Sequence, residues 1–331
     1  MHRPAAGAPD VTGASLLERR LVIVTGKGGT GKSTVAAALG LAASRAGRRV
    51  LVAEMGRDEA LVPLLDPGGP PAGHGGRELA PGLEALHIDP YEALAEYLGL
   101  QLGGTRLVRS VLRNQAFHQL MQAAPGWREL ITLGKVWHLE QMRTPAGRAR
   151  YDLIVVDAPA TGHGVAFLNV PRVVASAVRT GPLRRHTLAV EEMLEDPVRT
   201  LLLPIALAEE LPARETAELV RRVREEVGIA VDRVVVNRVA SAPFPAGLDR
   251  LDESLAELPQ QLRCGELPSA GALTQCARFL RSRHELGHHY LERIAEQTGL
   301  PLVELPELAE GVIDPGSLGR LGEALVQAEL E

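Results

Sequence analysis

The chain has 331 residues, of which 45% are hydrophobic and 23% charged, and its formal net charge at pH 7 is −5. This composition is typical of a globular protein with one large core or two smaller ones, and the acidic balance argues against nucleic acid as a partner. No apolar run reaches the roughly 18 residues that a membrane helix needs. Two cysteines, Cys264 and Cys276, make a disulfide scaffold unexpected, and we expect a cytoplasmic protein.

After residue 19, short apolar runs alternate with longer stretches whose apolar residues lie three and four apart. Residues 1–19 are expected to form a disordered leader before one domain at 20–330. Strands are predicted at 20–25, 48–55, 83–89, 151–160, 200–208, 231–239 and 300–305. Helices are predicted at 32–47, 91–142, 212–228, 276–297 and 315–330.

The predicted strands are apolar along nearly their whole length, which is typical of a parallel sheet covered by helices on both faces. We therefore expect an α/β fold with a doubly wound, mainly parallel sheet. Residues 91–150 are predicted to be a helical insertion, which residues 183–198 could extend. The Gly- and Pro-rich stretch 66–82 is predicted to be a mobile loop, and Pro204 is unfavourable within a strand.

Residues 26–33, GKGGTGKS, match the pattern G-x-x-x-x-G-K-[ST] in full, between a predicted strand and a predicted helix. This pattern predicts the phosphate-binding loop of a P-loop NTPase, because glycines let backbone N–H groups converge on phosphates at a helix N-terminus. Lys32 is placed to reach the β- and γ-phosphates, and Ser33 to bind Mg²⁺. The residues expected to bind nucleotide here are Gly28, Gly29, Thr30, Gly31, Lys32, Ser33 and Thr34.

Asp157 ends the apolar run LIVVD. An aspartate at the end of a buried strand beside a phosphate loop suits Mg²⁺ binding through water, although a lone aspartate there could equally cap a helix. The phosphate loop favours the Mg²⁺ role. The sequence therefore predicts Ser33 and Asp157 as the metal-binding pair.

The chain contains three lysines, and two of them, Lys27 and Lys32, lie in the phosphate loop. The segment KGGTGKST resembles the deviant phosphate loop of the ATPase group that includes ArsA, MinD, ParA and the nitrogenase iron protein. In that group the early lysine crosses a dimer interface and contacts the partner's nucleotide. The resemblance implies the same catalytic role in trans for Lys27.

Further segments narrow the resemblance to ArsA and the guided-entry ATPases that target tail-anchored membrane proteins. These segments are DAPATGHGVAFLNVP (157–171), VVVN (234–237), RHELGHHYLERI (283–294) and ELPELAEGV (304–312), and they occur in family order. The resemblance implies a dimeric, Mg²⁺-dependent ATPase that binds ATP and ADP, either as a homodimer or with a homologous subunit. It also implies that Asn237 recognises adenine, that Pro306 lies in the loop over the base, and that the partner is a protein client, membrane-associated in some relatives.

The sequence departs from the family after the second strand. Gly56 stands where the family has a catalytic aspartate in switch I, and the nearby carboxylates Glu54, Asp58 and Glu59 are candidates to position the attacking water. The alternative is that hydrolysis is slow or absent. The chain would then be a nucleotide-gated binding module, paired with a more competent homologous subunit.

A competing interpretation comes from HELGH (284–288), which matches the zinc-binding pattern H-E-x-x-H. Gly287 weakens the helix, and no third ligand lies at a diagnostic spacing. Ala277 and Leu280 occupy the positions of the zinc-binding cysteines of eukaryotic guided-entry ATPases. Zinc is therefore not expected. Residues 91–150 are also poor in methionine, so either a client groove or ordinary packing accounts for their apolar side chains.

Overall fold

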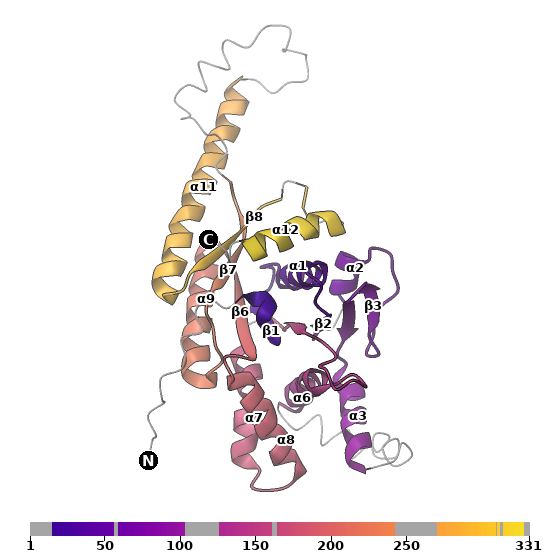
Figure 1. The fold of residues 1–331 in the computed structure, drawn as a ribbon. Helices are drawn as coiled ribbons and strands as arrows, with labels where there is room; N and C mark the ends of the chain where they lie inside the picture. Colours follow the sequence, from indigo (N-terminus) through magenta and orange to yellow (C-terminus); the bar gives the residue numbers. More distant parts are fainter. Residues whose placement is uncertain are drawn as a thin grey trace.

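The computed structural model describes residues 15–55, 59–102, 126–160, 164–241, 270–308, 310–311 and 314–327. Within these residues a sheet of eight strands runs through the molecule in the order β3-β4-β2-β5-β1-β6-β7-β8 (Figure 1). Its strands are β1 (Leu21–Gly26), β2 (Val50–Glu54), β3 (Arg77–Ala80), β4 (Leu83–His87), β5 (Leu153–Asp157), β6 (Thr200–Leu207), β7 (Val234–Val239) and β8 (Leu302–Pro306). Neighbouring strands are parallel except β3 and β4, which pair antiparallel.

Helices cover both faces of the sheet. One face carries α1 (Lys32–Arg45), α2 (Leu61–Leu65), α12 (Pro315–Gln327) and the short 3₁₀ turn η1 (Leu16–Glu18). The other carries α3 (Pro90–Leu102), α6 (Trp127–Gln141), α7 (Gly164–Ala177), α8 (Pro182–Glu195), α9 (Glu210–Arg222) with the π-helical turn η2 (Val223–Val227), and α11 (Ala270–Thr298). The expected doubly wound α/β fold, with helices on both faces of a mainly parallel sheet, is confirmed.

Strand β1 shows why the central strands lack a polar face. Leu21 and Ile23 pack into the core beneath α6, α7 and α8, whereas Val22 and Val24 pack beneath α1 and α12. All six residues of β1 are buried. Alternate side chains point to opposite faces of a strand, so a strand covered on both sides needs apolar residues throughout.

Pro204 lies within β6, in the middle of the sheet, so the strand predicted at 200–208 is present. The N–H of Leu202 donates to Ala230 on the side of β7, and Pro204, two residues later, faces the same way. The ladder between β6 and β7 begins at Ile205. The missing N–H of proline therefore falls just before that ladder, where its cost is small.

Two sequence expectations need correction. The predicted loop 66–82 contains β3. Its short sequence RELA shows no alternation of polar and apolar residues, and its pairing with β4 is broken by an irregularity between Glu78 and Ala80. Residues 15–19 of the expected disordered leader are part of the fold. Leu16 is fully buried, and the guanidinium of Arg19 pairs with Asp232 at 3.2 Å.

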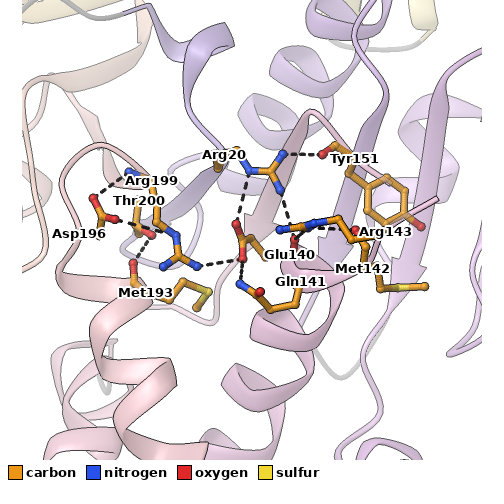
Figure 2. A network of polar contacts seen from close by, with 10 residues as sticks. All are labelled: Arg20, Glu140, Gln141, Met142, Arg143, Tyr151, Met193, Asp196, Arg199 and Thr200. Carbon is orange, nitrogen blue, oxygen red and sulfur yellow. Dashed lines mark hydrogen bonds and ion pairs between the residues drawn. The ribbon is translucent and has the colours of Figure 1, made fainter. Parts of the chain in front are cut away.

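A polar network ties α6 to the sheet (Figure 2). The carboxylate of Glu140, 4% exposed, accepts from Arg20 Nε at 3.4 Å and from Arg199 Nη2 at 2.9 Å. Arg20 precedes β1 and also donates to the backbone oxygens of Glu140 and Tyr151. Arg199 precedes β6. One buried carboxylate thus joins the helical layer to the start of two central strands.

Candidate nucleotide-binding site

The glycine-rich loop leaves the carboxyl end of β1 and enters α1, as predicted. Gly29 and Gly31 have φ angles of 85° and 89°, which L-residues with side chains rarely adopt. A Cβ atom at Gly31 would also overlap the side-chain amide of Asn237. Position 31 therefore requires glycine, because of its backbone angle and because of its neighbour on β7. The loop places the N-terminus of α1 at this edge of the sheet.

Lys32, the first residue of α1, turns its side chain back toward the loop. Its Nζ donates to the backbone oxygen of Lys27 at 3.0 Å. Burial lowers the pKa of Lys32 from its ordinary value, and the nearby charge of Asp157 works in the opposite direction. The ammonium thus lies in the loop where a phosphate oxygen would be its natural partner.

Ser33 and Asp157 meet although 124 residues separate them in sequence. Ser33 Oγ donates to Asp157 Oδ2 at 2.5 Å. Burial raises the pKa of the Asp157 carboxyl from its ordinary value, against the hydrogen bond from Ser33 and the charge of Lys32. Asp157 Oδ1 is buried and, within the described part of the chain, has no hydrogen-bond partner. A buried carboxylate oxygen without a donor, next to a hydroxyl, fits a hard cation such as Mg²⁺.

We expect Asp157→Asn to separate stability from activity. Asparagine keeps the shape and can still bond Ser33 but removes a charge that burial disfavours, so the free energy of unfolding at pH 7 should rise. Turnover with Mg²⁺ and ATP should fall by about 10²–10³-fold, the loss typical of one electrostatic stabiliser. Urea unfolding and phosphate release measure the two effects. A variant with unchanged turnover would contradict the Mg²⁺ role.

Lys27 lies at the outer side of the loop. Its Nζ donates to Glu215 Oε1 of α9 at 2.8 Å, within the same subunit. Glu215 is 188 residues away in sequence and belongs to no motif, so no sequence signal could have identified it. The predicted role of Lys27 in trans remains a prediction.

Asn237 and Pro306 come from the ends of β7 and β8. The side-chain amide of Asn237, 5% exposed, donates to Thr30 O of the loop at 2.9 Å, and its oxygen accepts from the N–H of Arg238 at 3.0 Å. Pro306 pairs in register with Val239. In this arrangement Asn237 braces the phosphate loop, and recognition of adenine by Asn237 and Pro306 stays a prediction.

Glu54 ends β2 directly beside Asp157 of β5. Its carboxylate accepts from the N–H of Ala60 at 2.7 Å and faces the N–H of Leu61 at 3.5 Å, so it holds the start of α2. Burial raises the pKa of Glu54 to about 7, and the charge of Asp157 adds to the rise. Of the other switch I candidates, Gly56 and Asp58 lie outside the described residues.

The raised pKa of Glu54 predicts a pH dependence of stability. The folded state holds the proton more tightly than the unfolded chain, so the stabilisation is complete below about pH 4.5 and is lost as pH rises through 7. Glu54→Gln resembles the protonated residue. Urea unfolding should find it close to the parent at pH 4 and more stable by on the order of 3 kcal/mol at pH 8.

The matched control for this comparison is Glu323→Gln, which removes an exposed carboxylate on α12. It should leave the pH profile of the parent protein unchanged. A stability difference between Glu54→Gln and the parent that stays constant from pH 4 to 8 would contradict the assignment.

The two histidines of HELGH share one face of α11, with ring centroids 4.7 Å apart, and His284 Nδ1 lies 2.9 Å from Ala240 O. Within the described residues no group of three or more His, Cys, Asp or Glu side chains is arranged to hold a metal ion. Thr161, Gly162 and His163, from the family-like segment 157–171, lie outside the described residues.

Comparisons with known proteins show the family of the chain. A family model described as anion-transporting ATPase matches residues 19–185. The chain is 33% identical to ATPase BagA of Mycobacterium tuberculosis, with 93% of each protein covered. It is 27% identical to an arsenical pump-driving ATPase of Acidiphilium multivorum, over 76% of this chain and 46% of that protein. It is 23% identical to ATPase GET3 of Kluyveromyces lactis, over 80% of this chain and 90% of that protein. The chain therefore belongs to the anion-transporting ATPase family.

Proposed function

We propose that the protein is a Mg²⁺-dependent ATPase in which ATP binding joins two subunits across their phosphate loops. The observation that supports this most directly is the convergence of Lys32, Ser33 and Asp157 at the carboxyl edge of β1 and β5. Lys32 and the loop N–H groups hold the phosphates, and Ser33 and Asp157 hold Mg²⁺, the latter through water. Lys27 acts on the nucleotide of the partner, which is a second copy or a homologous subunit.

ATP binding and hydrolysis would be communicated to a protein client through the helices α3, α6, α7 and α8, which lie on the lower face of the sheet in Figure 1. The resemblance to ArsA and the guided-entry ATPases is the basis for a client at this surface. In the part of the chain that the structure describes, no helix combines the length and the apolarity needed to cross a bilayer.

A second function is supported by the geometry at switch I. Gly56 replaces the family's catalytic aspartate, and Glu54, the described carboxylate closest to it along β2, is already engaged by the N–H groups of Ala60 and Leu61. Glu59 likewise accepts from the N–H groups of Ala72 and Gly73. With both of these described carboxylates engaged, the protein would bind ATP and respond to it while turning over little. In that case nucleotide occupancy alone would gate the client.

Steady-state phosphate release by the purified protein, with and without a homologous subunit, separates the two functions. Turnover above about 1 per minute by the protein alone supports the ATPase and contradicts the binding module, since typical enzymes are far faster than this. Turnover below that value, together with saturable ATP binding, supports the binding module. Absence of ATP binding would contradict both.

A further inference from the structure

The side chain of Lys27 is engaged inside its own subunit. Its Nζ lies 2.8 Å from Glu215 Oε1, in the first half of α9. Because the proposed function requires the same ammonium to reach a nucleotide on the partner subunit, Glu215 and the partner's phosphates compete for one cation.

The backbone of Lys27 is held independently of this ion pair. Its carbonyl oxygen accepts from Thr30 Oγ1 at 3.0 Å and from Lys32 Nζ at 3.0 Å. Because the main chain is fixed in this way, the ion-pair partner of the ammonium determines where the Lys27 side chain points. In this structure that partner is Glu215.

The Lys27–Glu215 pair is suited to being broken. The side chains are 33% and 39% exposed, so solvent screens their attraction and the pair contributes little to folding. A triphosphate with several negative charges is a stronger partner for an ammonium than one exposed carboxylate. The exchange therefore needs no unfolding of α9 or of the loop.

Glu215 also differs from the neighbouring acidic residue on α9. Glu218 pairs with Arg221, three residues further along the same helix, whereas Glu215 reaches across to the phosphate loop. Both border a cavity of about 810 Å³ that extends to Val165 at the start of α7. A long-range ion pair at the edge of an open cavity is accessible to an approaching subunit, while the local pair of Glu218 provides a matched comparison.

We propose that Glu215 is a positioning residue that holds Lys27 within its own subunit and releases it when a second ATP-bound subunit docks. This inference rests on the proposed function and adds its regulation: the ion pair raises the ATP concentration at which subunits join. It keeps Lys27 from being an unpaired cation on the dimer surface and makes docking conditional on the partner's phosphates.

Sedimentation velocity over a series of Mg²⁺–ATP concentrations tests the inference with Glu215→Gln, Glu218→Gln and Lys27→Ala. Glu215→Gln keeps the size of the side chain and removes its charge. It should lower the ATP concentration at half-maximal dimer by about two- to fivefold, the range expected from an exposed ion pair. Glu218→Gln should need the same ATP concentration as the parent. Both glutamate variants should unfold at the parent's urea midpoint within error.

The outcomes distinguish this inference from the proposed function. If Lys27→Ala fails to dimerise and Glu215→Gln behaves as the parent does, or needs more ATP, the holding role of Glu215 is wrong and the proposed function stands. If Lys27→Ala dimerises as the parent does, or if ATP changes the mass of the parent neither alone nor with the homologous subunit, both are wrong. A shift of equal size in Glu218→Gln would assign the effect to the charge of α9 and contradict a specific role for Glu215.

Discussion

Replacing Lys27 with alanine is expected to lower the rate of ATP hydrolysis by about 10³–10⁵-fold, the contribution of a cation supplied in trans to phosphoryl transfer. ATP binding should be retained, because Lys32, Ser33 and the loop backbone are unchanged. The described contact of the Lys27 side chain is the exposed pair with Glu215, so the fold should tolerate its loss. Single-turnover phosphate release and equilibrium binding of a fluorescent ATP analogue give the two quantities.

Another lysine of the chain provides a control for this experiment. Lys135, the third lysine, lies on α6, away from the phosphate loop, and pairs with Glu96 of α3 at 2.5 Å. Lys135→Ala should hydrolyse ATP at the parent's rate. Lys27→Arg should rescue poorly, because the broad guanidinium does not replace a compact ammonium between phosphates. Normal hydrolysis by Lys27→Ala would show that the deviant-loop assignment is wrong.

The largest loss of stability is expected from Glu140→Ala. Both oxygens of this buried carboxylate accept from arginines, Arg20 and Arg199 (Figure 2). Its removal takes this acceptor from two partly buried guanidinium groups, of which Arg199 keeps only Asp196, at 3.9 Å, as an ion-pair partner among the described residues. Breaking a buried ion pair by deleting one partner typically costs about 3–5 kcal/mol. Because both arginines are partly exposed and Arg199 keeps Asp196, urea denaturation should show a fall at the lower end of that range in the free energy of unfolding, still a large part of the stability of a typical domain.

Two further variants serve as comparisons for Glu140→Ala. Glu140→Gln keeps one acceptor and the side-chain volume, so its loss should be smaller than that of alanine. Glu192→Ala, at an exposed position on α8, should change stability by no more than about 0.5 kcal/mol. A change of that small size in Glu140→Ala would mean that the network is not a significant link between α6 and the sheet.

The fold could be predicted in outline because its central strands are apolar on both faces and each is followed by a helical pattern. The α1 segment and its phosphate loop follow directly from the spacing of glycine, lysine and serine. Strand β3 was missed because four residues at a sheet edge, two charged and then two apolar, show no alternation. The order of residues 15–19 was missed because one buried leucine and a long-range ion pair, Arg19–Asp232, leave no local pattern.

The candidate site, like the fold, could be predicted only in part. The phosphate loop and Asp157 were identified because each carries a local signal: a glycine motif, or an acid at the end of a buried strand. The bracing of the loop by Asn237 and the pairing of Lys27 with Glu215 depend on packing between distant elements. Glu54 caps α2 because the chain turns back toward it after β2. The sequence alone does not show this turn.

The central claim is that ATP joins two subunits and that Lys27 carries this response. Sedimentation velocity of the parent protein and of Lys27→Ala, each without nucleotide and with Mg²⁺ and ATP, tests it most directly. The account predicts that ATP converts the parent from monomer to dimer and leaves Lys27→Ala monomeric although the variant binds ATP. A parent protein whose mass does not change with ATP, either alone or with a homologous subunit, or a variant that dimerises equally well, would contradict the account.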